Sequence, residues 1–166
     1  MSYQQWYDKY VANNNNILQN NKNNVNIEKM REKEEKQLQY IGKIDKNKIG
    51  KYKDIAITDE VILTDERLNE HILKYHKNEY EQLRPYMKDI IENPDFILDD
   101  NRNENTIILL KQVPETKKNG RVVIKIAVAE DAKHPKNSII TLMKLNDRTW
   151  KQTIKNRGNI IFDKNE

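Results

Sequence analysis

The sequence of 166 residues contains no cysteine, which excludes disulfide bonds, thiolate zinc sites and a cysteine nucleophile. It has no apolar run near the roughly 18 residues that a membrane helix needs, and no signal-peptide pattern. With only four glycines, it also lacks a phosphate-binding glycine loop, a nucleophile elbow, and the HExxH and EF-hand motifs. These absences favour a soluble protein of a reducing compartment whose chemistry depends on other side chains.

Apolar residues are also scarce, at 36% of the chain, and they gather between Ile55 and Phe162. The first fifty residues hold few of them, and nine of the fourteen residues 13–26 are asparagine, a poor former of helices and strands. We therefore expect two parts. Residues 1–54 are predicted to form a helical and linker appendage, and residues 55–166 to form one folded domain.

Charge is unevenly distributed although the net charge is only +4. Residues 59–104 carry 13 acidic and 6 basic residues, whereas residues 105–166 carry 13 basic and 6 acidic residues. The basic half is typical of a protein that binds a polyanion, but it would equally suit packing against the acidic half. Charge alone leaves both interpretations open.

Hydrophobic periodicity and capping residues predict an α+β domain. Helical segments come first, with Thr64 and Asn78 as expected N-caps and a kink at Pro85. Asp147 is the expected N-cap of a late helix. The expected fold is N-terminal helices packed on a four- to five-stranded, mostly antiparallel sheet with one late helix. The predicted helices are 27–38, 65–75, 79–92 and 147–155, and the predicted strands are 60–63, 96–99, 106–113, 121–129, 138–145 and 159–162.

Two of the three histidines lie in the first domain helix, five residues apart. At 100° per residue, His71 and His76 border the buried stripe of Leu68, Ile72 and Tyr75 on opposite sides. This spacing does not suit a two-histidine metal site on one helix. The two rings converge only if the helix ends near Tyr75 and the chain turns at His76.

The strands add a lysine and two hydroxyl side chains. In the predicted strand 121–129, alternation puts Val122, Ile124, Ile126 and Val128 on one face. Lys125 lies on the other face among small residues, so it either extends to solvent or points into a site. Ser138 and Thr141 fall on opposite faces of a regular strand. Histidine, lysine and hydroxyl groups together suffice to cleave RNA without a metal, because they supply proton transfer and charge stabilisation at the phosphate.

Several blocks of the sequence, in this order, resemble a known family. They read TDERLNEHILKYH, IIENPDFILDD, NTIILLKQV, VVIKIAVA and HPKNSIITLMKLNDRTWKQTIKN, and the match covers about Glu60 to Lys164. They are similar to the phage-associated nucleases of the barnase/EndoU/colicin/RelE-like (BECR) superfamily, which occur at the C-terminus of phage minor head proteins and in toxin modules. The segment SYQQWYDKYV near the N-terminus also resembles one that such head proteins carry before this domain.

The resemblance implies a BECR-like fold and metal-independent cleavage of RNA, without a cofactor. Carried over to this sequence, it suggests His76, His71, Lys125, Ser138 and Thr141 as catalytic residues. It suggests that Arg67, His134 and Lys144 bind the substrate. The implied partners are RNA, transfer RNA among them, and an acidic immunity or antitoxin protein or the parent head protein. The implied location is the bacterial cytoplasm or the virion.

Two other functions remain open from the sequence. A non-catalytic phage head component or protein-binding inhibitor could retain the same fold, and it would fold normally without turnover. An ADP-ribosyltransferase is disfavoured, because the sequence lacks a clear glutamate-x-glutamate pair after a strand.

Overall fold

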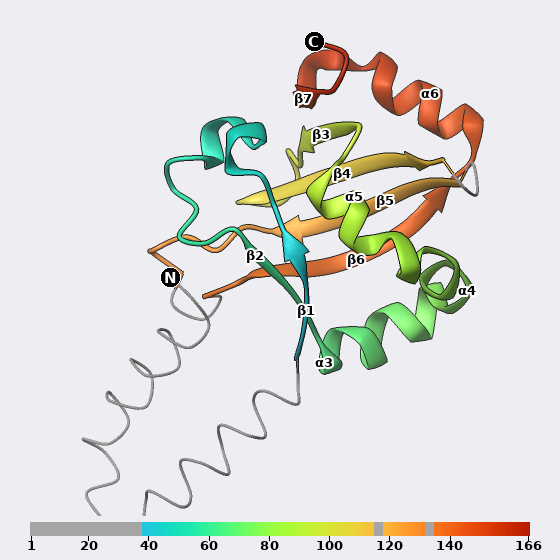
Figure 1. Cartoon of the computed structure of the whole chain (residues 1–166), viewed down its shortest axis with the longest axis horizontal. Coiled ribbons are helices and arrows are strands. Elements are labelled where there is room, and N and C mark those ends of the chain that lie inside the picture. Colours follow the sequence, from blue (N-terminus) through green and yellow to red (C-terminus); the bar gives the residue numbers. More distant parts are fainter. Residues whose placement is uncertain (1–37, 115–117, 132–134) are drawn as a thin grey trace, which may run out of the picture.

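The computed structural model describes residues 38–114, 118–131 and 135–166, which form a sheet of seven strands with helices (Figure 1). The strand order is β1-β2-β6-β5-β4-β3-β7, and neighbours run antiparallel except for β2 and β6, which are parallel. This confirms the α+β class and the mostly antiparallel sheet, but the expected count of four to five strands is wrong, since the sheet has seven. The strands are Leu38–Lys43 (β1), Glu60–Thr64 (β2), Phe96–Asp99 (β3), Thr106–Val113 (β4), Lys118–Lys125 (β5), Asn137–Leu145 (β6) and Ile160–Asp163 (β7).

The sheet includes residues that the sequence had assigned to the N-terminal appendage. Strand β1 pairs with β2, and two short 3₁₀ turns, Lys46–Lys48 (η1) and Gly50–Tyr52 (η2), follow it. Ile44, Ile49 and Tyr52 are buried in the main core. The folded domain therefore begins before the expected boundary at residue 54. The rest of the expected helix 27–38, and the N-terminal segment SYQQWYDKYV, lie outside the described residues.

One long helical segment follows β2, and Thr64 caps it as expected, since its Oγ1 accepts a hydrogen bond of 3.1 Å from the Arg67 amide. The segment comprises Asp65–Arg67 (α3), a π-helical turn Leu68–Ile72 (η3), Leu73–Leu83 (α4), a 3₁₀ turn Arg84–Tyr86 (η4) and Met87–Glu92 (α5). Asn78 was expected to cap a separate helix, and this is wrong because it lies inside α4. Pro85 does interrupt the helix, between α4 and α5.

The main core lies between α4, α5 and one face of the sheet. The predicted alternation of Val122, Ile124, Ile126 and Val128 toward one face is confirmed, and all four are buried there. A Cβ on Gly120 would lie 2.9 Å from the Ile90 side chain, so α5 can pack this closely only over a glycine. None of the helices in the described ranges is long and apolar enough to span a membrane.

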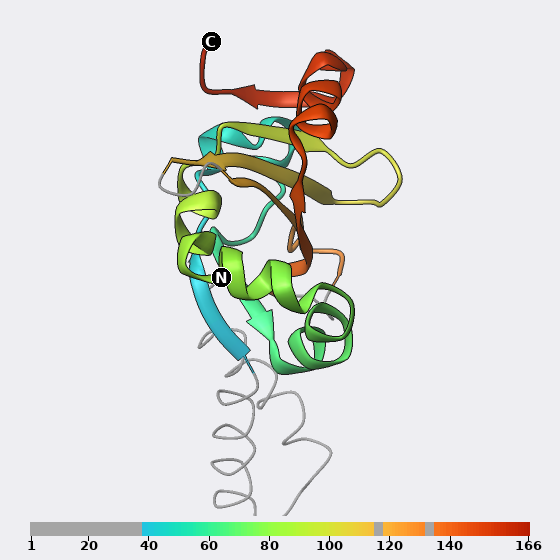
Figure 2. The ribbon, with the colours of Figure 1, turned by 90° about the vertical axis from the view of Figure 1, so that its right-hand side faces the viewer.

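The late helix α6, Asp147–Lys155, packs on the opposite face. Trp150 and Ile154 contact a small cluster of Phe96, Leu98 and Leu110. Asn146, and not Asp147 as expected, caps the helix, because its Oδ1 accepts from the Thr149 amide at 2.7 Å. Helix α6 and β7 lie at one end of the molecule and α3 and α4 at the other (Figure 1, Figure 2). On the face that carries α6, strands β5 and β6 therefore lie between α6 at one end and the α3–α4 segment at the other.

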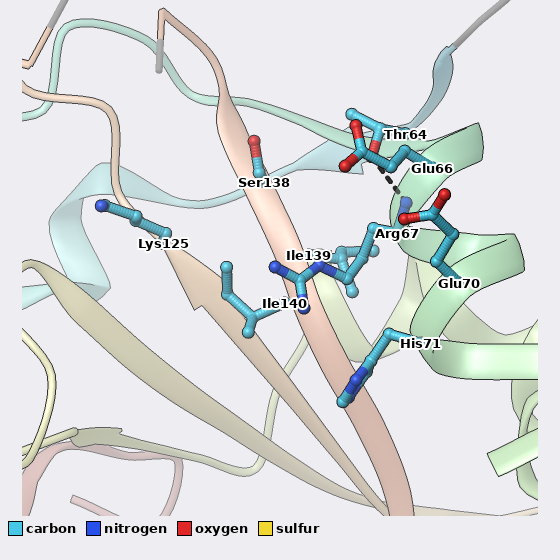
Figure 3. Close-up of a pocket in the computed structure, with 9 residues that line it drawn as sticks. All are labelled: Thr64, Glu66, Arg67, Glu70, His71, Lys125, Ser138, Ile139 and Ile140. Atoms are coloured by element: carbon cyan, nitrogen blue, oxygen red, sulfur yellow. Dashed lines mark hydrogen bonds between the residues drawn. The ribbon is translucent and has the colours of Figure 1, made fainter. Parts of the chain in front are cut away.

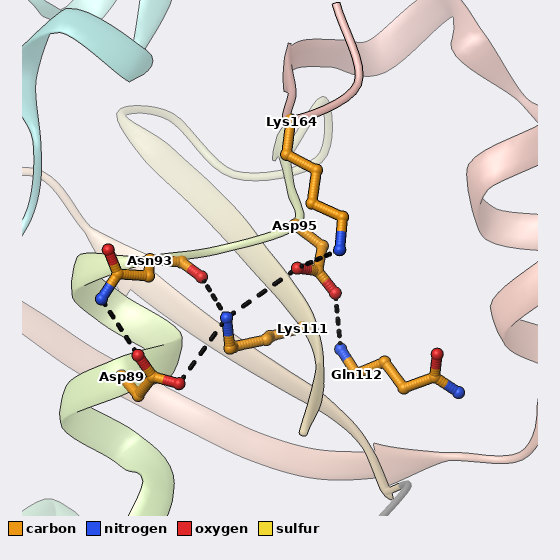
Figure 4. Close-up of polar contacts among 6 residues, drawn as sticks. All are labelled: Asp89, Asn93, Asp95, Lys111, Gln112 and Lys164. Carbon is orange, nitrogen blue, oxygen red and sulfur yellow. Dashed lines mark hydrogen bonds and ion pairs between the residues drawn. The ribbon is translucent and has the colours of Figure 1, made fainter. Parts of the chain in front are cut away.

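A polar network fixes the turn between α5 and β3 (Figure 4). The Lys111 ammonium donates to the Asn93 carbonyl at 2.7 Å, and lies 3.6 Å from Asp89 and 3.9 Å from Asp95. Asp95 also accepts from the Gln112 amide and pairs with the Lys164 ammonium at 2.9 Å. The network ties the chain's C-terminal segment to β4, so the buried Asp95 carboxylate is fully partnered.

Candidate active site

A pocket of about 460 Å³ opens where the helical segment after β2 meets β5 and β6 (Figure 3). Arg67 and His71 reach it from the helical segment, and Lys125 lines its far side at the end of β5, with its ammonium directed away from the histidine. Nine residues line it: Thr64, Glu66, Arg67, Glu70, His71, Lys125, Ser138, Ile139 and Ile140. Four of the residues expected to form the site, Arg67, His71, Lys125 and Ser138, therefore share one pocket.

A β-bulge in β6 shapes the floor of this pocket. Val123 of β5 lies opposite Thr141 of β6. The next β5 residue, Ile124, lies opposite Ile139, so Ile140 is an extra residue on the bulged strand. An extra residue reverses the alternation of side chains beyond it. The expectation that Ser138 and Thr141 lie on opposite faces is therefore wrong.

Because of the bulge, two core-facing residues of β6 are three positions apart. Ile139 and Leu142 are both buried in the main core. Ser138 and Thr141, also three apart, lie opposite Lys125 and Val123, which occupy the same face of β5. Both hydroxyls therefore face the side of the sheet that carries the pocket, together with the lysine.

The two histidines also converge, with ring centroids 5.8 Å apart. Two departures from α-helical geometry bring them together. The π-helical turn Leu68–Ile72 accommodates an extra residue, and His76 has a non-helical backbone (φ −137°, ψ 32°) that kinks α4. The expectation that the rings diverge holds only for a regular helix. The structure instead matches the other possibility, a change of direction at His76.

His71 is the histidine closest to the sheet hydroxyls. Its Nε2 lies 3.3 Å from the Thr141 Oγ1. Burial lowers the pKa of His71 below its usual value of 6.5, and the positive charges of Arg67 and His76 lower it further. At neutral pH His71 is therefore mainly neutral, the form that can accept a proton.

His76 is held by a carboxylate that sequence reasoning missed. The Nδ1 of His76 lies 3.2 Å from the Glu79 Oε1, and the other oxygen, Oε2, accepts a 2.6 Å hydrogen bond from the Lys144 amide. Glu79 thus anchors the histidine to the backbone of β6. Because a carboxylate accepts at Nδ1, that nitrogen carries the hydrogen and Nε2 is left for a substrate. A glutamate three residues after a helical histidine was the available sequence signal.

The cations of the pocket have different surroundings. The Lys125 ammonium lies 3.4 Å from Asp131, and its side chain is 32% exposed. The half-buried Arg67 guanidinium has no hydrogen bond or ion pair within the described part of the chain. Glu66 and Glu70 line the same pocket but are exposed, so water and salt screen their charges more strongly. The attraction of the half-buried cations for an anion in the pocket is therefore stronger than the repulsion from the two exposed carboxylates.

A further arginine lies on the same face of β5 and was not singled out from the sequence. The β4–β5 register is unbroken from Lys118 to Lys125, so Arg121 and Lys125 project to the same side. Arg121 is half-buried, and burial lowers its pKa while the nearby Asp100 opposes that shift. Arg121 and Lys125 are an even number of positions apart in one predicted strand, and this spacing could have identified Arg121 from the sequence.

The remaining expected site residues do not line the pocket. His76 and Thr141 lie beside it, each next to His71. Lys144 lies on the other side of β6 from Thr141, and its ammonium donates to Gln82 at 2.6 Å. His134 lies outside the described residues. Among residues 38–114, 118–131 and 135–166, no three histidine or carboxylate side chains are grouped as metal ligands.

Comparison with known proteins adds one match. Residues 22–163 match the family model described as phage-Barnase-EndoU-ColicinE5/D-RelE like nuclease2. No curated protein and no solved structure matches the chain. The matched region covers the whole sheet and every residue of the pocket. The chain therefore belongs to this family of phage-associated BECR-fold nucleases.

Proposed function

We propose that this protein is a metal-independent ribonuclease that cleaves RNA through its ribose 2′-hydroxyl. The observation that carries the proposal is the pairing of two histidine rings, 5.8 Å apart, beside a pocket lined by Arg67 and Lys125. Two imidazoles at this distance can reach the entering and leaving oxygens of one phosphodiester. Histidine also serves both as base and as acid near neutral pH.

In the proposed reaction, neutral His71 accepts the proton of the 2′-hydroxyl as the 2′-oxygen bonds to phosphorus. The bond from phosphorus to the 5′-oxygen breaks, and His76, acting as an imidazolium whose Nδ1–H is held by Glu79, donates its Nε2 proton to that oxygen. Lys125 and Arg67 stabilise the negative charge that builds up on the phosphate. Thr141, which contacts His71 in the free site, turns its hydroxyl to a phosphate oxygen, and Ser138 binds the same group. The products are a 2′,3′-cyclic phosphate and a 5′-hydroxyl.

The proposal predicts that the purified protein cleaves RNA in excess EDTA, because none of these roles needs a metal ion. A chimeric oligonucleotide with one ribonucleotide in a 2′-deoxy strand should be cut only after that ribonucleotide. Mass spectrometry should identify the cyclic phosphate. A fully 2′-deoxy strand serves as the matched control.

Other outcomes would contradict this mechanism. Cleavage that EDTA abolishes would indicate a metal enzyme. Cleavage of the 2′-deoxy strand would exclude attack by the 2′-hydroxyl. No cleavage of any RNA by folded protein would favour a non-catalytic module with the same fold.

The depressed pKa of His71 predicts a pH dependence. A general base acts only when deprotonated, so kcat/KM should rise with pH and reach its half-maximum below 6.5. Replacing Arg67 by glutamine removes a positive neighbour, which makes protonation of His71 easier and raises its pKa. The acid limb of the profile should therefore move to higher pH in Arg67→Gln.

This shift can be measured separately from any loss of phosphate binding. NMR titration of the His71 ring protons gives its pKa without substrate, and the kcat/KM profile gives the kinetic midpoint. The matched control is Arg84→Gln, which removes an exposed arginine of η4 outside the pocket. If the NMR midpoint moves in Arg67→Gln while the kinetic midpoint stays in place, His71 is not the base that the profile reports.

A further inference from the structure

Tyr75 presents an aromatic ring to solvent directly beside the two histidines. Its side chain is 62% exposed, more than the other large hydrophobic side chains described as exposed, Tyr40 and Ile55. Its ring centroid lies 5.5 Å from that of His71, and the two rings are tilted by 59°. A tilted neighbour contacts the ring without stacking on it, so Tyr75 remains available for a stacking partner.

The exposure of Tyr75 contradicts the sequence pattern. At regular helical spacing, Tyr75 belongs to the buried stripe with Leu68 and Ile72. Only Ile72 is fully buried, and Leu68 packs at the edge of the core. The π-helical turn at Leu68–Ile72 turns the following residue positions around the helix axis, which moves Tyr75 out of the core. The same distortion that joins the histidines therefore places this ring beside them.

A cation accompanies the ring. The Lys74 ammonium lies over one face of the Tyr75 ring, 5.3 Å from its centroid, so a base would stack on the other face. Proteins that bind single-stranded nucleic acid combine aromatic rings, on which bases stack, with cations that follow the phosphates. Tyr75 and Lys74 provide this combination next to the pair that we assign to proton transfer.

We propose that Tyr75 stacks on the nucleobase of a nucleotide that flanks the cleaved phosphodiester, so that the substrate is RNA single-stranded at that point. This inference rests on the proposed ribonuclease function and specifies its substrate. A base in an A-form duplex is already stacked and paired, and it cannot lie on a protein ring without leaving the helix. Every base has a π-face, so Tyr75 selects for an unstacked base and not for a particular sequence.

The test measures Tyr75→Ala and Tyr75→Phe on single-stranded oligonucleotides with one cleavable ribonucleotide. A stacked base contributes about 1–3 kcal/mol, so Tyr75→Ala should raise KM by about 5- to 150-fold, and Tyr75→Phe should stay within about threefold of wild type. A second set of substrates carries an abasic site in turn on either side of the cleaved bond. At the stacked position, the abasic substrate should remove the difference between wild type and Tyr75→Ala.

The matched control is Tyr40→Ala, which removes an exposed tyrosine of β1 outside the pocket and should leave KM unchanged. A fully 2′-deoxy strand gives a binding readout by fluorescence anisotropy that does not depend on cleavage. Thermal melting checks that each variant is folded.

The outcomes separate the inference from the proposed function. If wild type cleaves RNA and Tyr75→Ala has the wild-type KM, the inference is overturned and the ribonuclease function stands. An equal loss on normal and on both abasic substrates would show that Tyr75 only supports His71, which also overturns it. If wild type binds the strand in a Tyr75-dependent way but cleaves nothing, the stacking role stands and the proposed catalytic function fails. Preferred cleavage of a blunt duplex would contradict both the stacking role and the single-stranded substrate.

Discussion

Replacing His71 or His76 by alanine is expected to lower kcat for RNA cleavage by about 10²–10⁴-fold, because in the proposed mechanism each histidine transfers a proton in the transition state. Neither ring is part of the apolar core, so the variants should fold and bind RNA with nearly wild-type affinity. The measurement is single-turnover cleavage of an oligonucleotide with one ribonucleotide. A large loss of kcat with little change in affinity identifies an interaction made in the transition state.

The double variant distinguishes a cooperating pair from two independent residues. If the histidines act as base and acid on one phosphodiester, losing both should cost little more than losing one, because the residues act as a unit. If the fold-loss of kcat in the double variant equals the product of the two single losses, the histidines do not share a reaction step. The matched control is Lys77→Ala, which alters an exposed residue adjacent to His76 in α4. Its kcat should remain within about threefold of wild type.

Glu79 connects this prediction to the architecture of the site. Its carboxylate bonds to His76 with one oxygen and to the Lys144 amide of β6 with the other. Without Glu79, the Lys144 N–H on this side of β6 would lack this partner. The residue that holds the histidine therefore also completes the bonding of β6, and this explains how a kinked helix keeps the ring in one orientation.

Local sequence signals predicted the fold well where a single rule controls the structure. The alternation from Val122 to Val128 defined the core face of β5 and of the residues that follow it, and the Thr64 cap marked the start of the helical segment. Such signals depend on neighbours within a few residues. The place of β1 in the sheet was missed, because its pairing with β2 spans a sequence separation that no local pattern records.

The site was harder to predict because it depends on two departures from regular geometry. In a regular strand Ser138 and Thr141 diverge, and in a regular helix His71 and His76 diverge. The bulge at Ile140 and the π-helical turn reverse both results. Each insertion of one residue depends on long-range packing and leaves no clear local signal. The residue types of the candidate site could therefore be proposed from the chemistry of RNA cleavage, but their convergence could not be predicted.

Replacing Asn137 by alanine is expected to destabilise the protein by about 3 kcal/mol, the largest stability effect that we predict. Asn137 is fully buried at the start of β6. Its Oδ1 accepts from the Ala127 amide at 2.8 Å, and its Nδ2 donates to the Thr58 carbonyl at 2.8 Å. Alanine would leave both backbone groups buried without these partners, and each unpaired group costs about 1–3 kcal/mol.

This variant should also impair catalysis, because Asn137 joins the segments that carry Lys125 and Ser138. Denaturant unfolding measures the change in free energy, and kcat/KM far below the melting temperature measures the effect on the folded site. Displacement of a positioned group by about 1 Å can lower a rate by about 10²-fold.

The matched control is Asn165→Ala, at an exposed position, which should change stability by less than about 0.5 kcal/mol. A loss below about 1 kcal/mol in Asn137→Ala would mean that water or a shift of the backbone replaces both bonds. In that case the side chain would not be what holds the two halves of the pocket in register.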